Sequence, residues 1–172
     1  MNMNTDAKQR RIALREWRER DAPALFALAS DSIVAESAGF PVHNDLVESI
    51  RVIREVFCKP ESYAVVSASD GMLLGCINLY PVRKEESVYE SEAVKIGYWL
   101  GHPFWGRGLM TEAVKVLCLH CFNSGKFRCV KVVGYVKEDN VCSRRVLEKV
   151  RFMLAEAKNG IHRYELPKGE IK

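Results

Sequence analysis

The order of apolar and polar positions predicts strands and helices along the whole chain. Residues 11–17 (RIALREW) alternate between polar and apolar side chains, which is typical of a half-buried strand. Asp21 before Ala22-Pro23 predicts a helix that runs through Ala29, with Asp21 as its N-cap. Asn44 or Asp45 begins a second predicted helix, and a loop covers residues 30–45. The apolar stripe of that second helix is Leu46, Ile50, Ile53 and Phe57.

The middle of the chain predicts three strands. Residues 63–69 and 72–80 flank Asp70-Gly71, a dipeptide typical of a tight turn between antiparallel strands. The polar stretch 82–92 is interpreted as a surface loop, and residues 93–100 form the third strand.

The C-terminal part predicts two helices and three further strands. A helix over 109–123 has an apolar face and ends before Gly125. The residues of that face are Met110, Ala113, Val114, Leu117 and Cys121. A strand over 127–136, a helix over 141–150 and a hairpin (152–157 and 161–166) around Asn159-Gly160 complete the chain.

These elements predict one α+β domain. The order is β-α-α-β-β-β-α-β-α-β-β, which lacks the strict alternation of a doubly wound sheet. Residues 1–10 are interpreted as a disordered tail and residues 11–172 as a single domain with a mixed, mostly antiparallel sheet flanked by helices. The 172 residues are 48% hydrophobic, enough for a core of that kind.

Composition excludes some classes of function. The chain contains no apolar run of about 18 residues, the length of a membrane span. A formal charge of +4, with scattered basic residues, gives little support to nucleic-acid binding. The polar N-terminus does not resemble an export signal, so we expect a cytoplasmic protein with six reduced cysteines. Cys118 and Cys121 lie within a predicted helix and are interpreted as core residues, so no metal is expected.

The sequence GHPFWGRGLMTEA (101–113) joins a predicted strand to a predicted helix. Gly106 and Gly108 lack Cβ atoms, so their backbone can approach a ligand closely. The first amides of a helix have no internal partners and attract anions. The junction therefore predicts a phosphate site, although a turn that needs glycine only for its dihedral angles remains the alternative.

Two motifs together resemble the GNAT N-acetyltransferase superfamily, most closely its RimJ/RimL branch. One is IGYWLGHPFWGRGLMTEAV, and the other is EDNVCSRRVLEKVRF about thirty residues later. Trp105 and Met110 depart from the superfamily's Gln/Arg-x-x-Gly-x-Gly/Ala loop, but Trp-Gly-x-Gly is common in the RimJ/RimL branch. The second motif is matched at Asn140, Ser143, Leu147, Glu148, Lys149 and Phe152. Arg151 replaces its glycine.

The resemblance implies acetyl-CoA as donor and an amine as acceptor. The pantetheine arm would lie in a gap between strands 93–100 and 127–136, and the pyrophosphate would meet the amides of 105–110. The implied coenzyme-binding residues are Trp99, Leu100, Trp105, Gly106, Arg107, Gly108, Leu109, Met110, Asn140 and Ser143. The acceptor would be a protein N-terminus or a small amine, with no nucleic acid or membrane involved, and a homodimer is possible.

The resemblance leaves the acid–base chemistry partly open. Leu147 stands where many relatives have a catalytic tyrosine, so Ser143 is the candidate acid, with capping or phosphate binding as its alternative role. Tyr135 occupies a position where some relatives have a catalytic Glu, and Lys95 occupies another. Tyr135 and Ser143 are the catalytic candidates. Glu92, Glu156 and His162 are more often solvated surface groups, and no general base is assigned.

Two other functions are alternatives to the enzyme. A protein that binds acyl-CoA without turnover would fit the missing tyrosine and the unassigned base. A P-loop nucleotide-binding protein is disfavoured, because the loop lacks the Gly-Lys-Ser/Thr ending that holds β- and γ-phosphates.

Overall fold

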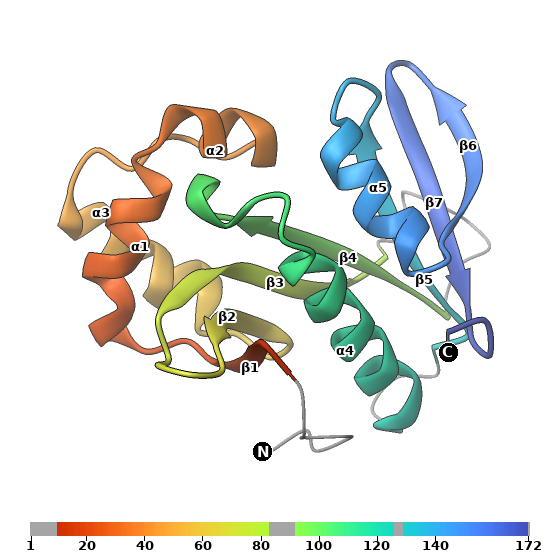
Figure 1. Ribbon diagram of the computed structural model, residues 1–172, viewed down its shortest axis with the longest axis horizontal. Helices are drawn as coiled ribbons and strands as arrows, with labels where there is room; N and C mark the ends of the chain where they lie inside the picture. The colour runs from red at the N-terminus through yellow and green to blue at the C-terminus, as the bar shows by residue number, and fades with distance from the viewer. Residues whose placement is uncertain (1–9, 83–91, 126–128, 172) are drawn as a thin grey trace. The chain divides into compact units, whose positions relative to one another are not determined.

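The computed structural model describes residues 10–82, 92–125 and 129–171, and they form seven strands and five α-helices (Figure 1). The strands are β1 (Ile12–Glu16), β2 (Ser62–Ser67), β3 (Leu73–Pro81), β4 (Ala93–Leu100), β5 (Lys131–Lys137), β6 (Met153–Lys158) and β7 (Ile161–Pro167). The α-helices are α1 (Ala22–Ala29), α2 (Ser32–Ala38), α3 (Leu46–Val52), α4 (Leu109–Asn123) and α5 (Val141–Lys149). Short helical turns occur at Glu19–Asp21, Ile53–Phe57 and His102–Phe104.

The sheet is mixed and mostly antiparallel, which confirms the predicted fold class. Its hydrogen-bonded order is β1-β2-β3-β4-β5-β7-β6. The β4–β5 pair is parallel, whereas β1–β2, β2–β3, β5–β7 and β6–β7 are antiparallel. The chain divides into two compact units, residues 1–78 with 98–113 and residues 79–97 with 114–172. We call them the first and the second unit.

The first unit has its core between helices α1 and α3 and strands β2 and β3. Trp17 stacks on Phe57 with ring centroids 4.6 Å apart, and Leu25 and Ile53 are fully buried beside them. Asp21 precedes α1 as predicted, but its carboxylate does not cap the helix. Burial raises the pKa of Asp21, and the hydrogen bonds from Arg15 and the Arg18 amide outweigh that effect, so the pKa is lowered overall.

The predicted loop over residues 30–45 is wrong in part, because it contains α2. Asp31 caps this helix by accepting from the Ile33 amide at 2.9 Å, and Gly39 ends it with a φ of 76°. The helix has only seven residues, and one of its apolar side chains, Ile33, is exposed. Its sequence therefore has no apolar stripe from which a helix could be predicted.

The second predicted helix begins at Leu46, and Asp45 caps it by accepting from the Glu48 amide at 2.7 Å. The helix widens into a π-turn over Ile53–Phe57, where the Cys58 amide reaches the carbonyl of Ile53 at 2.7 Å. The predicted stripe holds at Ile53 and Phe57, whereas Leu46 is exposed.

The second unit packs α5 and most of α4 with strands β5–β7. The predicted inner face of α4 is confirmed, since all five of its residues are buried. Cys118 and Cys121 lie in this core as predicted, and burial raises the pKa of the Cys118 thiol. The strand predicted at 127–136 begins at Lys131, where its ladder with Ala93 begins, and residues 127 and 128 lie outside the described residues. The loop at 82–92 and the tail also fall almost entirely outside them.

Candidate active site

The glycine junction belongs to the first unit, where it links β4 to α4. Strand β4 ends at Leu100, a short helical turn spans His102–Phe104, and α4 begins at Leu109. Gly106 and Gly108 each have a φ of 73°, in the left-handed region that disfavours side chains. An added Cβ at Gly106 would meet no heavy atom within 4 Å. Glycine is therefore needed at Gly106 for its backbone angles, and the main chain there is not covered by neighbours.

Side-chain hydrogen bonds hold this loop from both sides. Trp105 donates from Nε1 to the carbonyl oxygen of Leu100 at 2.8 Å. Arg11 donates from Nη1 to the carbonyl oxygen of Arg107 at 2.7 Å, and its Nε and backbone amide both donate to the Glu112 carboxylate. These hydrogen bonds within the chain fix the loop conformation.

The start of α4 offers main-chain amides to a ligand. Leu109 and Met110 have buried side chains, so only their backbone groups are available for binding. The first amides of a helix have no intrahelical acceptor, and the helix dipole adds about half a positive charge at this end. This arrangement suits an anionic group such as a diphosphate.

Trp99 and Leu100 lie at the end of β4. Trp99 packs against Phe40 with ring centroids 5.4 Å apart, as part of the first unit's core cluster. Leu100 is buried, and its carbonyl accepts the Trp105 indole. Gly75 on β3 lets β4 come close, because a Cβ at Gly75 would clash with the Trp99 carbonyl oxygen. The side chains of Trp99 and Leu100 therefore serve packing.

The parallel ladder between β4 and β5 is short. It pairs Ala93–Ile96 with Lys131–Gly134, whereas β4 continues to Leu100 and β5 continues to Lys137. The ladder thus ends before either strand does. The resemblance to the GNAT superfamily implies that strands 93–100 and 127–136 separate from each other, and the end of the ladder falls within these ranges.

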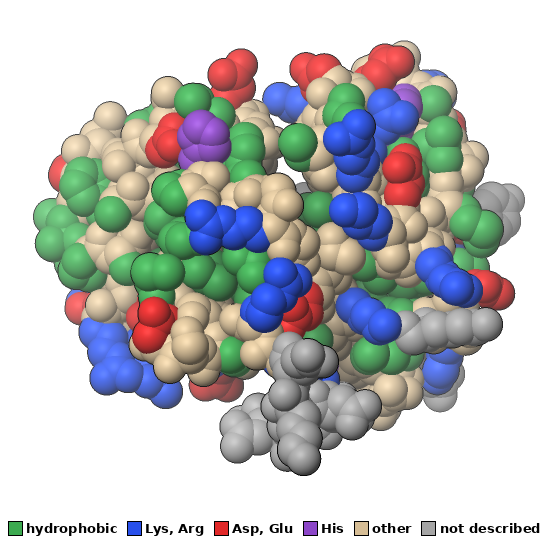
Figure 2. All heavy atoms as spheres, viewed as in Figure 1, with side chains coloured by type: hydrophobic (Ala, Val, Ile, Leu, Met, Phe, Trp, Pro, Cys, Tyr) green, Lys and Arg blue, Asp and Glu red, His purple; other side chains and the backbone are tan. Residues whose placement is uncertain are grey.

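Asn140 and Ser143 lie at the start of α5 in the second unit. Asn140 caps the helix, because its Oδ1 accepts a hydrogen bond from the Ser143 amide at 3.0 Å. Ser143 sits in the first helical turn and is half-buried. The structure therefore places Asn140 in a capping role at the start of α5. Figure 2 shows Lys and Arg side chains gathered over the helix α5 face of this unit, a surface compatible with anions.

Tyr135 is a half-buried residue of β5 whose ring is in contact with a cation. Lys95 Nζ lies 5.0 Å from the centroid of the Tyr135 ring. At this distance the ammonium is attracted by the ring's quadrupole. The two positions where the resemblance implies an acidic catalyst in some relatives are thus occupied here by a lysine and a tyrosine in contact with each other.

The remaining candidates for a general base have different surroundings. Glu92 and Glu156 are exposed, as expected for solvated groups. His162 was expected at the surface, but it is buried on β7 near Tyr164, and its Nδ1 has no hydrogen-bond partner among the described residues. The alternation of buried and exposed residues along β7 accounts for this position.

Arg11 and Glu112 are site residues that sequence reasoning missed. Arg11 is separated from Arg107 by 96 residues, and no motif links them. Their contact depends on where the segment before β1 meets the start of α4, which local patterns do not reveal.

The described residues contain no group of three or more His, Cys, Asp or Glu side chains arranged for a metal. Within the same parts of the chain, no helix has the length and hydropathy of a membrane span.

Comparison with known proteins identifies the family. A profile of the GNAT acetyltransferase domain matches residues 11–153, so the chain belongs to the GNAT acetyltransferase family. It is 33% identical over 96 residues to a probable N-acetyltransferase, YjcK, of Bacillus subtilis strain 168. That match covers 55% of this chain and 50% of the relative, so the chain spans about half the length of this curated relative.

Solved structures share the fold at low sequence identity. A GNAT-family acetyltransferase from Bacillus anthracis superposes with a TM-score of 0.78 at 17% identity, over 93% of this chain and 96% of that one. RimL, a ribosomal L7/L12 α-N-protein acetyltransferase in complex with coenzyme A, gives 0.72 at 20% identity over 92% and 95%. A spermidine N-acetyltransferase from Vibrio cholerae, with CoA and spermine, gives 0.73 at 13% over 93% and 97%. At these identities the similarity establishes the fold alone.

Proposed function

We propose that this protein is an acetyl-CoA-dependent N-acetyltransferase that acts on a primary amine. The observation that supports this most strongly is the loop of Gly106 and Gly108. It has left-handed backbone angles, is held by Arg11 and Trp105, and leads directly into the amides of α4. Family membership and the CoA complexes of RimL and the spermidine acetyltransferase support the same donor.

Acetyl-CoA would be bound mainly by main-chain groups. The diphosphate would accept hydrogen bonds from the amides of 106–110, since the Trp105 amide already donates to the carbonyl oxygen of His102 at 3.1 Å. The pantetheine arm would lie along β4 beyond Ile96, where the ladder with β5 ends. Amide groups of the arm can pair with a strand as an additional strand would.

The transfer itself requires little covalent help from the protein. The neutral amine nitrogen attacks the thioester carbonyl carbon, a C–N bond forms and the C–S bond breaks. The amine loses a proton and the departing thiolate gains one. A β4 amide in 97–100 would stabilise the negative charge that develops on the carbonyl oxygen, and the Ser143 hydroxyl would protonate the sulfur.

The acceptor class is a primary amine, either a protein N-terminus or a small molecule. RimL acetylates a protein α-amine and another neighbour a polyamine, so the fold by itself does not select between them.

The test combines binding and turnover on the whole chain. Calorimetry with CoA should show one site, and a thiol-release assay with acetyl-CoA should respond to N-terminal peptides or small amines. Product masses should increase by one acetyl group. Binding of CoA without release for any amine would contradict turnover and would fit an acyl-CoA-binding protein. The absence of binding would contradict the entire proposal.

A further inference from the structure

The two faces of the second unit's sheet differ at the point where the β4–β5 ladder ends. On one face, Gly134 is covered by helix α5: an added Cβ would lie 2.9 Å from Leu147 Cδ1 and 3.6 Å from Ile96 Cγ2. Leu147 is fully buried. At Gly134 this face is therefore filled by the packing of α5.

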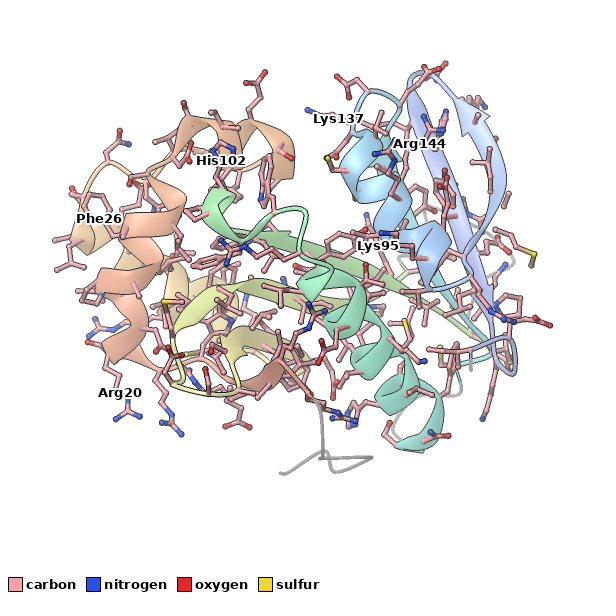
Figure 3. The ribbon with its side chains drawn as sticks, in the orientation of Figure 1. Arg20, Phe26, Lys95, His102, Lys137 and Arg144 are labelled. Carbon is pink, nitrogen blue, oxygen red and sulfur yellow. The ribbon has the colours of Figure 1, made fainter. Side chains whose placement is uncertain are left out.

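The opposite face presents Lys95 and Tyr135. Strand alternation places Tyr135 on the face away from Gly134, and the contact of Lys95 Nζ with the Tyr135 ring places Lys95 on the same face. Both side chains are half-buried, and Figure 3 labels Lys95 on β4 and Lys137 at the end of β5. The register pairs Tyr135 with Arg163 on β7. Tyr135 is therefore flanked by basic residues on both neighbouring strands.

The charge on this face is predominantly positive. By register and alternation, the basic residues that β4 to β7 place on it are Lys95, Lys131, Lys137, Lys158 and Arg163. The acidic residues on the same strands and face are Glu156 and Glu165. Glu165 forms ion pairs with both Lys131 and Arg163, so its charge is already matched. Five basic and two acidic side chains leave an excess of three positive charges.

We propose that Lys95 selects the acceptor by pairing with a carboxylate next to the amine that becomes acetylated. The proposal rests on the proposed function and names its substrate class. Leu147 fills the other face beside Gly134, so the Lys95 face is the one that presents charged side chains at the end of the β4–β5 ladder. An ammonium has three N–H donors, so Lys95 can donate to a carboxylate while it keeps its other contacts. Acceptors with additional positive charges are repelled.

Two kinds of acceptor have this chemistry. One is an amino acid, with its α-carboxylate beside the amine. The other is a peptide N-terminus with Asp or Glu at its first or second position. In both, the amine must be neutral to attack, and the carboxylate contacts Lys95 rather than the reacting atoms.

The experiment measures thiol release from acetyl-CoA with matched acceptors. Three peptides differ only at the second residue, which is Glu, Gln or Lys, and a free amino acid is compared with its amide. Spermidine serves as the polycationic acceptor. We expect kcat/KM to be highest for the Glu peptide or the free amino acid, and whichever of the two is preferred identifies the source of the carboxylate.

Variants at Lys95 connect the preference to this side chain. Lys95→Met should lower kcat/KM for the preferred acidic acceptor by about fivefold, the upper range for a partly exposed ion pair, and leave the Gln peptide unchanged. Lys95→Glu should shift the preference toward the Lys peptide, and Lys95→Arg should preserve it. Lys115→Met, an exposed charge on α4, is the control and should have no effect.

The outcomes separate this inference from the proposed function. If thiol release occurs with equal rates for the three peptides, or the Lys peptide is preferred, the inference is wrong and the enzyme remains. The inference is also wrong if the Lys95→Met variant still prefers the acidic acceptor. If no acceptor gives release although CoA binds, the proposed function fails and the inference fails with it. Circular dichroism of each variant identifies losses that come from unfolding.

Discussion

Arg11 donates a hydrogen bond from Nη1 to the carbonyl oxygen of Arg107 at 2.7 Å, which joins the residue before β1 to the loop between the two glycines. The same side chain forms an ion pair with Glu112 at 3.2 Å. One guanidinium therefore connects the loop and the first turn of α4, and its planar group suits two acceptors at once.

Replacing Arg11 should loosen the loop. We expect Arg11→Ala to weaken CoA binding by about fivefold, because the contact is exposed and exposed ion pairs contribute at most roughly 1 kcal/mol. Arg11→Lys should recover little of this loss, since a lysine lacks the planar group with several donors. Calorimetry measures the affinity, and Arg20→Ala, at an exposed position away from the loop, is the control. Unchanged affinity in Arg11→Ala would mean that the loop holds its conformation without this contact.

Gly108 should tolerate no bulky residue. Gly108→Trp places a side chain at a φ of 73° and next to the amides of α4. We expect CoA binding to be lost while the domain stays folded, with a decrease in unfolding free energy of about 1–2 kcal/mol from the backbone angle.

Gly71→Trp is the matched control, because Gly71 has a φ of 74° in the turn between β2 and β3. It should show the same backbone cost and normal CoA binding. Calorimetry and chemical denaturation measure both properties. If Gly108→Trp retains its affinity for CoA, the diphosphate does not bind at this loop.

Ser143→Ala tests the proposed acid. We expect kcat to fall by about 100-fold, within the usual range for general acid catalysis, and the CoA affinity to stay within a factor of about two. The helix cap should survive, since Asn140 accepts from the backbone amide of Ser143 and not from its hydroxyl. Cys142→Ala, the exposed neighbour, is the control. If kcat is unchanged, Ser143 has no role in the chemistry.

Arg151 has left-handed backbone angles, with a φ of 76°, where the family motif has glycine. The chain therefore keeps the turn after α5 despite the substitution. We expect Arg151→Gly to raise the free energy of unfolding by about 1 kcal/mol, because glycine removes the steric cost of this conformation. Asn159→Gly, at a φ of 51°, should gain less, since asparagine tolerates the left-handed region. Urea denaturation measures both. If Arg151→Gly is no more stable than the parent protein, the backbone at Arg151 is not strained.

His43 should make stability depend on pH. Burial lowers the pKa of His43 below its ordinary 6.5, an effect that Glu48 partly opposes. The unfolded chain thus binds more protons than the folded one, so this contribution is complete above about pH 6.5 and is lost as the pH falls.

We expect the free energy of unfolding to decrease between about pH 7 and pH 5, and less so in His43→Gln, which can still reach Ser49. Denaturation at several pH values measures the slope. His43 Nδ1 lies 2.8 Å from Ser49 Oγ, so Ser49→Ala reports the loss of that contact separately. An identical slope in His43→Gln would assign the pH dependence to other groups.

The sequence by itself determined most of the secondary structure and the glycine loop. The apolar run of 93–100, the apolar face of α4 and the glycine that follows it are local features, and they predicted β4 and α4 with their observed bounds. Local patterns failed at α2, a short helix whose stability comes from packing and a cap rather than from a periodic stripe. They also predicted wrongly that the Asp21 carboxylate caps α1. In the structure this carboxylate forms a bidentate contact with Arg15.

Only the tertiary structure decided which distant residues act together. Arg11 meets Arg107, and Lys95 lies over Tyr135, because strand register and helix packing bring separate segments into contact. The same packing buries His162 and closes one face of the sheet with Leu147. A sequence motif specifies backbone conformation within a few residues, whereas the charge and access of a site depend on neighbours from other elements, and those are set by the fold.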